Sequence, residues 1–187
     1  MGKHFRMNEK SKTRETVSSI YFIGIGGIGM SALARYFHSK GASVSGYDKT
    51  ASSLTKELEQ AGMNIHYEEN VDLIPRDVQL VVYTPAIPQD HKELVFYRQN
   101  GYKVVKRSDV LQMITKSSFN ICIAGTHGKT TISTMIAHIL RHSEFGCNAF
   151  LGGISVNYNT NFWSSNSNCR IMCDEKANLI CAFSLCS

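Results

Sequence analysis

The chain has 187 residues, of which 43% are hydrophobic and 19% charged, values typical of a folded protein and not of a disordered or fibrous one. The net charge is +5, but residues 1–16 supply +3 of it with only one aromatic residue, so we expect a basic tail over residues 1–18 and no nucleic-acid surface. No apolar run is long enough to span a bilayer and none follows the charged N-terminus as in a secretory signal, which favours a cytoplasmic protein.

After the tail, short apolar runs alternate with segments of helical periodicity. A strand over 19–23 precedes a glycine-rich stretch and a helix over 30–40. Further strands are expected over 42–47, 63–66, 79–83 and 103–105, and further helices over 52–61, 91–100 and 107–115. This alternation predicts an α/β fold in which helices cover both faces of a parallel sheet. We assign residues 19–115 to such a Rossmann-like domain, with a linker at 116–118.

The pattern resumes after the linker with a strand over 119–124, a helix over 130–142 and a strand over 147–151. A stretch rich in Asn and Ser follows Gly152 and Gly153, and we expect it to form a loop. We assign residues 119–175 to part of a second α/β domain, which the family resemblance given below implies to be an incomplete P-loop ATPase domain.

The first glycine-rich stretch has the spacing G-x-G-x-x-G at Gly24, Gly26 and Gly29, with a further glycine at Gly27. Between a strand and a helix, this spacing lets a pyrophosphate approach the helix N-terminus. Asp48 ends the next strand and is expected to accept hydrogen bonds from a ribose. NAD, FAD and UDP-sugars all carry a pyrophosphate, so the motif leaves the nucleotide open, and a nicotinamide-dependent oxidoreductase is one alternative.

The second glycine-rich stretch lies between a predicted strand and helix and reads Gly125, Thr126, His127, Gly128, Lys129, Thr130 and Thr131. Gly-Lys-Thr supplies bare backbone N–H groups, a positive charge and a hydroxyl that can ligate Mg²⁺. The stretch is shorter than the usual G-x-x-x-x-G-K, because Ile123 stands at the position of the first glycine. It predicts a site for ATP and Mg²⁺, where His127 lies within reach of the nucleotide.

Both stretches, together with Ser45-Gly46-Tyr47-Asp48, Tyr83-Thr84-Pro85-Ala86-Ile87 and Arg107-Ser108-Asp109-Val110-Leu111, occur in an order that resembles the N-terminal part of the Mur ligase family. The resemblance covers about Ile20 to Ser165 and is strongest to the members that add L-alanine. It implies ATP-dependent joining of L-alanine to UDP-N-acetylmuramate through an acyl phosphate, in peptidoglycan synthesis.

The resemblance also implies roles for individual residues. Lys129 and Thr130 would be catalytic within the ATP-binding stretch Gly125–Thr131, and Thr130 would ligate Mg²⁺. The residues expected to bind the UDP-sugar are Gly24, Gly26, Gly27, Gly29, Asp48, Thr84, Pro85 and Ser108. A Mur ligase that recycles a whole tripeptide shares the second stretch, and a non-catalytic UDP-sugar-binding fragment is a further alternative.

The chain departs from the family near its end. Glu175 matches an acidic residue expected to help hold Mg²⁺, but Met172 stands where the family has a glutamate. Residues 176–187 do not match, and we interpret this tail as the product of a frameshift or a degraded gene. We therefore expect the chain to be inactive as an enzyme and the second sheet to leave Ile121, Ile123 and Phe150 poorly covered.

Overall fold

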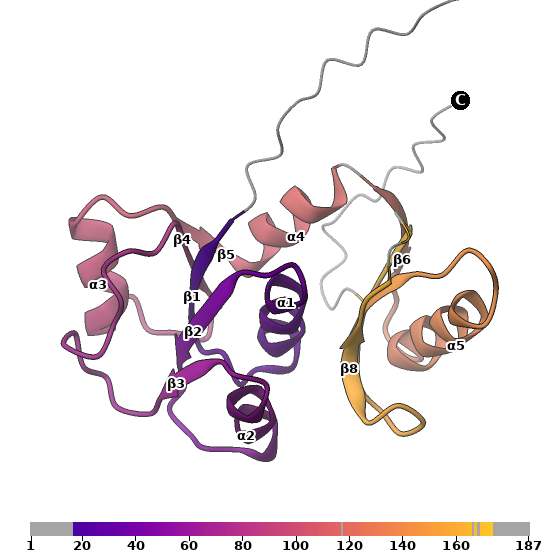
Figure 1. Cartoon of the computed structure of the whole chain (residues 1–187), viewed down its shortest axis with the longest axis horizontal. Helices are drawn as coiled ribbons and strands as arrows, with labels where there is room; N and C mark the ends of the chain where they lie inside the picture. Colours follow the sequence, from indigo (N-terminus) through magenta and orange to yellow (C-terminus); the bar gives the residue numbers. More distant parts are fainter. Residues whose placement is uncertain (1–16, 117, 166, 168, 174–187) are drawn as a thin grey trace, which may run out of the picture.

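The computed structural model describes residues 17–116, 118–165, 167 and 169–173. Two β-sheets lie side by side, one formed by the first hundred residues of this part and the other by the remainder (Figure 1). Glu175 and the tail over 176–187 lie outside the described residues. None of the helices in the described ranges is long and apolar enough to cross a bilayer.

The first sheet is parallel throughout and has the strand order β3-β2-β1-β4-β5. Its strands are β1 (Ser19–Ile23), β2 (Ser43–Tyr47), β3 (Asn64–His66), β4 (Leu80–Tyr83) and β5 (Val104–Lys106). Strands β2 and β3 are added on one side of β1, and β4 and β5 on the other, so the strand order switches between β1 and β4. In sheets of this kind ligands bind at the carboxyl edge near that point. The predicted α/β, Rossmann-like fold is confirmed.

Four helices cover this sheet: α1 (Ile28–Ser39), α2 (Ser53–Gln60), α3 (Lys92–Gln99) and α4 (Arg107–Thr115). Successive residues of a strand point to opposite faces, and β1 shows the consequence. Ile20 and Phe22 pack in the core formed with α1, α2 and α4, whereas Tyr21 and Ile23 pack in the core formed with α3. A strand with both faces covered has to be apolar at every position, which explains the run that begins the fold.

The second sheet has the order β6-β9-β7-β8, in which β8 alone is antiparallel to its neighbour. Its strands are β6 (Phe119–Ile123), β7 (Asn148–Ser155), β8 (Thr160–Trp163) and β9 (Cys169–Cys173), and α5 (Lys129–Arg141) follows the second glycine-rich stretch. The loop predicted after Gly152 is wrong, because β7 continues to Ser155 and turns into β8. The Asn-rich composition hides this hairpin, whose strands are held by main-chain pairing that does not depend on side-chain type.

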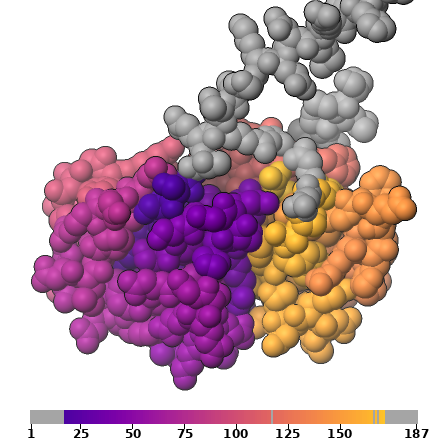
Figure 2. All heavy atoms as spheres, viewed as in Figure 1, coloured from indigo at the N-terminus to yellow at the C-terminus, as the bar shows by residue number. Residues whose placement is uncertain are grey.

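The two sheets share an apolar core across their contact. Phe150 of β7 and Phe162 of β8 lie 5.3 and 6.0 Å from Tyr36 of α1, measured between ring centroids, and both belong to the cluster that contains Phe22. Figure 2 shows the atoms of the second sheet in direct contact with those of the first part. The linker at 116–118 thus separates two sheets that share one apolar cluster, although the second sheet and α5 also form a cluster of their own. The division of the chain into two independent domains stays a prediction.

Poor cover was expected at Ile121, Ile123 and Phe150, and this is wrong for Ile123 and Phe150, whereas Ile121 is half-buried. Ile123 and Phe150 are 8% and 5% exposed, because α5 covers one face of this sheet and α1 the other. Other apolar side chains of this part are exposed: Ile132, Met135 and Ile139 on the outer face of α5 are 47%, 60% and 64% exposed, and Phe119 of β6 and Ile154 of β7 are 47% and 41% exposed. The sequence pattern of a strand shows that it needs cover but not which element supplies it.

A buried polar cluster lies in the core beside α3. The hydroxyl of Tyr21 donates to Glu93 Oε2 at 2.6 Å and lies 2.7 Å from His66 Nε2. The backbone N–H of Asn70 donates to the other carboxylate oxygen of Glu93 at 3.3 Å. Glu93 is fully buried, and burial raises its pKa to about 7 despite these hydrogen bonds. Burial also lowers the pKa of His66.

These shifts predict how the stability of the chain depends on pH. The raised pKa of Glu93 stabilises the folded state at a pH below the ordinary pKa of the carboxyl group. This contribution to the unfolding free energy is lost as the pH rises to the folded-state pKa of about 7. Glu93→Gln has no ionisation to lose, so wild type should lose about 3 kcal/mol of unfolding free energy relative to this variant between about pH 5 and pH 8. Urea unfolding at each pH measures the difference. The exposed Glu144→Gln is the control, and a difference independent of pH would contradict the prediction.

Candidate functional site

The first glycine-rich stretch forms the turn from β1 into α1 at the carboxyl edge of the sheet. Gly24 has a positive φ of 86°, and the N–H groups of Gly24 and Ile25 donate to Tyr47 O at 2.8 and 3.0 Å. A Cβ on Gly24 would lie 3.1 Å from Thr84 Cγ2. The turn is therefore held between the ends of β2 and β4, where Thr84 packs against it. The binding of a UDP-sugar by Thr84 stays a prediction.

Asp48 fixes this turn from the end of β2. Its Oδ2 accepts the N–H of Gly26 at 2.7 Å, and its Oδ1 accepts the N–H of Thr50 at 3.2 Å. A Cβ on Gly26 would lie 2.8 Å from Asp48 Oδ2 and 2.7 Å from Thr55 Cγ2, so only glycine allows this approach. Asp48 thus has a structural contact that the sequence did not predict, and its bond to a ribose stays a prediction.

The start of α1 offers donors to an anion. Its N-cap is Gly27, to which the described residues give no side-chain cap, and the first turn carries no acidic residue. The first N–H groups of a helix have no partner within the helix, and its dipole makes this end positive. Twelve residues of helix lie behind the turn. The arrangement suits a phosphate group, as the glycine spacing predicts.

The other predicted contacts lie around this edge. Pro85 is exposed just beyond Thr84, and Ser108 is exposed in the first turn of α4, with its hydroxyl 3.4 Å from Asp109 Oδ1. The sequence reasoning missed Arg107, whose guanidinium lies against Gly29 in the first turn of α1. Its position directly after β5 was the available signal, because that strand end lies at the same edge as the glycine turn.

The second glycine-rich stretch joins β6 to α5. Gly125 and Gly128 have φ values of 145° and 77°, both in the region that favours glycine, and Gly128 is the N-cap of α5. The ammonium group of Lys129 donates to Gly125 O at 2.6 Å and lies 3.4 Å from Thr126 O. The stretch thus holds its lysine over the loop, beside the positive end of a helix of 13 residues.

The remaining residues of this stretch differ in their surroundings. Thr126, His127 and Thr131 are exposed, whereas Thr130 is half-buried with its Cγ2 3.3 Å from where a Cβ on Gly153 would lie. No group of three or more His, Cys, Asp or Glu side chains suited to a metal ion occurs among the described residues. Of the two predicted Mg²⁺ ligands, Thr130 lies among the described residues and Glu175 lies outside them.

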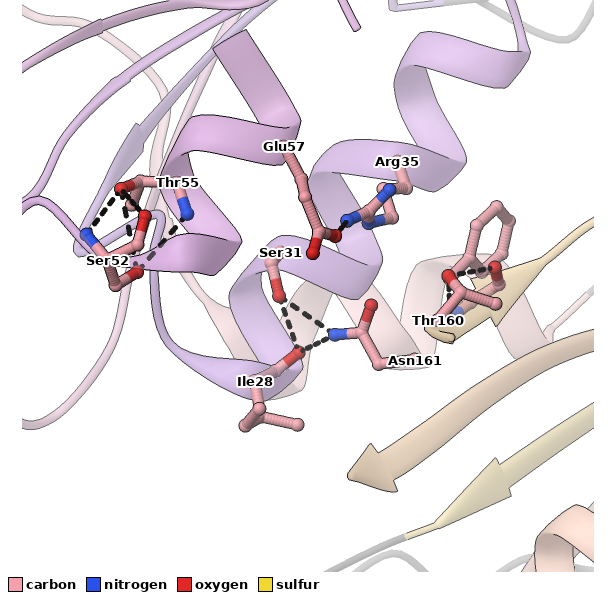
Figure 3. A network of polar contacts seen from close by, with 9 residues as sticks. Ile28, Ser31, Arg35, Ser52, Thr55, Glu57, Thr160 and Asn161 are labelled. Carbon is pink, nitrogen blue, oxygen red and sulfur yellow. Dashed lines mark hydrogen bonds and ion pairs between the residues drawn. The ribbon is translucent and has the colours of Figure 1, made fainter. Parts of the chain in front are cut away.

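The hairpin of β7 and β8 contacts both glycine-rich stretches. Asn161 of β8 is fully buried, and its Nδ2 donates to Ile28 O at 2.6 Å and to Ser31 Oγ at 2.8 Å in the first turn of α1 (Figure 3). Gly153 of β7 faces Thr130 at the start of α5. The N-termini of α1 and α5 are thus placed against one hairpin, although about a hundred residues separate them in the sequence.

A family model and curated proteins that match this chain are all Mur ligases. The model described as "Mur ligase family, catalytic domain" matches residues 19–119. The UDP-N-acetylmuramate–L-alanine ligase of Phocaeicola vulgatus is 59% identical over 157 residues, which are 81% of this chain and 34% of that protein. The corresponding ligase of Cytophaga hutchinsonii is 56% identical over 155 residues, 80% and 33% of the two chains. The chain spans about a third of the length of the curated relatives it matches.

Solved structures show the same likeness. The UDP-N-acetylmuramate-alanine ligase MurC from Thermotoga maritima superposes with a TM-score of 0.73 at 34% identity, over 82% of this chain and 36% of that one. A murein peptide ligase from Psychrobacter arcticus gives a TM-score of 0.75 at 25% identity, over 83% and 37% of the two chains.

Proposed function

The chain belongs to the Mur ligase family, and we propose that it forms the part of an alanine-adding ligase that binds UDP-N-acetylmuramate and ATP. In this reaction ATP supplies the phosphoryl group that activates the lactyl carboxylate as an acyl phosphate, which the amine of L-alanine then attacks with loss of phosphate. The high identity to relatives named UDP-N-acetylmuramate–L-alanine ligase supports this assignment. A role in peptidoglycan synthesis and a place in the cytoplasm follow from it as proposals.

The UDP-sugar is proposed to bind at the carboxyl edge of the first sheet. Gly24, Gly26, Gly27 and Gly29 form the turn that brings the diphosphate to the start of α1. Asp48, already bonded to the turn, has carboxylate lone pairs left for a ribose hydroxyl. The residues proposed to complete this site are Thr84, Pro85 and Ser108.

ATP is proposed to bind at the second stretch, with Gly125–Gly128 presenting backbone N–H groups and Lys129 neutralising charge on the transferred phosphate. Thr126, His127 and Thr131 line the same stretch. The hydroxyl of Thr130 suits Mg²⁺, which takes one or two protein oxygens and completes its shell with phosphate oxygens and water.

The contact of the β7–β8 hairpin with both stretches is the observation that carries the proposal. A ligase must bring the carboxylate of one ligand to the terminal phosphate of the other, because proximity supplies much of the rate of a reaction between two bound molecules. Asn161 bonds the hairpin to the start of α1, and Gly153 of the same hairpin lies close to Thr130 at the start of α5. The hairpin therefore sets the geometry between the two proposed sites.

Calorimetric titration with UDP-N-acetylmuramate, ATP and NADH tests the proposal. We expect UDP-N-acetylmuramate and ATP to bind independently, because each proposed phosphate site has its own glycine turn. We expect no binding of NADH. Binding of NADH alone would favour the oxidoreductase alternative and contradict the proposal. Addition of the other nucleotide should leave each stoichiometry unchanged.

A non-catalytic UDP-sugar-binding fragment is the second candidate. It differs from the ligase proposal in its expected response to ATP, which it would not bind. The tripeptide-recycling ligases share the fold and the second stretch, and a test of L-alanine against the tripeptide separates them. We retain the prediction that residues 1–187 alone show no phosphate release dependent on L-alanine.

A further inference from the structure

We propose that Arg107 binds the diphosphate of the nucleotide-sugar together with the first turn of α1, and that Gly29 is glycine to admit its guanidinium. The inference rests on the proposed function, since it concerns the same site, and it adds the side chain that determines the preference for a diphosphate. Its basis is an arginine held against the positive end of a helix without an acidic partner.

The guanidinium of Arg107 lies against Gly29, the last glycine of the first stretch. A Cβ on Gly29 would lie 2.4 Å from Arg107 Cζ, 2.5 Å from Nε and 2.6 Å from Nη2. These distances are shorter than the contacts that Cβ atoms make, so the guanidinium occupies the space where every other residue type would carry a Cβ. Arg107 begins α4 directly after β5, and this places its backbone at the carboxyl edge of the sheet near the turn.

The electrostatics of this arrangement are unfavourable without an anion. A helix N-terminus carries a partial positive charge, and cations are normally found at the opposite end. Here the first turn of α1 has no acidic residue to offset a neighbouring guanidinium. An anion between the two would be attracted by both, and a phosphate accepts two parallel hydrogen bonds from one guanidinium.

The described residues leave Arg107 without a partner. Its Nε is buried and has no hydrogen-bond acceptor, which costs free energy that an acceptor on a ligand would recover. Asp109, the acidic residue nearest in sequence, is engaged by the N–H of Lys106 at 3.1 Å and the hydroxyl of Ser108. Arg35, the arginine on α1 itself, is paired with Glu57 at 2.7 Å (Figure 3). Arg107 is therefore the arginine in this region whose charge is available to a ligand.

Titration of the whole chain with UDP-N-acetylmuramate, UDP and uridine tests the inference. Arg107→Gln should weaken binding of both diphosphates by about ten- to a hundredfold, because hydrogen bonds to charged groups contribute about 1.5–3 kcal/mol. Binding of uridine, followed by NMR at millimolar concentration, should not change. Arg107→Lys should recover part of the loss, since it restores the charge but not the paired donors. The salt dependence of UDP binding should also become weaker in Arg107→Gln.

Arg76→Gln is the matched control, because Arg76 is an exposed arginine that lies over Phe96. Its affinities should equal those of wild type, and thermal unfolding of each variant shows whether the fold is kept. Equal UDP affinity in Arg107→Gln and wild type would overturn the inference, as would an equal loss for UDP and uridine, which indicates a structural role. Failure of wild type to bind UDP-N-acetylmuramate would instead contradict the proposed function.

Discussion

Replacement of Lys129 with methionine is expected to weaken ATP binding about a hundredfold. Lys129 is half-buried at the start of α5, and its ammonium group already lies over the loop carbonyls of Gly125 and Thr126. Two hydrogen bonds from this group to phosphate oxygens would contribute about 3 kcal/mol or more, since bonds to charged groups contribute about 1.5–3 kcal/mol each. Methionine keeps the length and apolar stem of the side chain and removes the charge. Calorimetric titration with ATP and Mg²⁺ measures the loss.

The variant should retain its affinity for UDP-N-acetylmuramate, because Lys129 lies in the second stretch and the sugar nucleotide is proposed to bind at the first. Lys49→Met is the matched control, an exposed lysine next to Asp48 in a turn of the first sheet. Its affinity for ATP should equal that of wild type. Unchanged ATP binding in Lys129→Met would show that the second stretch does not hold the nucleotide in the predicted way.

Replacement of Phe150 with alanine is expected to lower the unfolding free energy by about 3–5 kcal/mol, the usual effect of truncating a buried phenylalanine. Phe150 is 5% exposed and packs on Phe162 and Tyr36, with centroid distances of 5.1 and 5.3 Å. Its loss removes the second sheet's main apolar contact with α1. We expect wild type to unfold in a single thermal transition and the variant to unfold its second sheet at a lower temperature.

Trp163 reports on the second sheet alone, because it is the single tryptophan of the chain and lies on β8. Its fluorescence should change before the far-ultraviolet circular dichroism in Phe150→Ala, and together with it in wild type. Phe145→Ala is the control, since Phe145 is 78% exposed and its truncation should change stability by less than about 0.5 kcal/mol. A small effect of Phe150→Ala with coincident transitions would contradict the shared core.

The helices and strands of the first sheet could be predicted because their signals are local. Each apolar run stops at a residue that breaks it, such as Gly24 after β1, and Ser52 caps α2 with its own side chain. The predicted ends of these elements differ from the observed ones by two residues or fewer. The hairpin after Gly152 could not be predicted, because two glycines interrupt the apolar pattern of β7, and its strands are stabilised by the pairing of β7 with β8 and β9.

The candidate site shows the same division. The glycine spacing and the Gly-Lys-Thr sequence located two turns at helix starts, because few residue types permit such backbone conformations and close approaches. Phosphate binding at these turns stays a prediction. Neither Arg107 nor Asn161 was predicted. An arginine at a helix start is common and a single asparagine has no pattern, so each acquires meaning only from the element it lies against.

The sequence by itself determined the order of strands and helices as far as the start of β7, the position of both glycine turns and membership of a family whose motifs it carries. These are properties of neighbouring residues, and the short spacing between those residues is sufficient to define them. Only the tertiary structure decided that β9 lies between β6 and β7, that α1 joins both sheets in one core, and that Arg107 faces Gly29. Such contacts join residues far apart in the chain, and they depend on which apolar faces and charges the folded elements bring together.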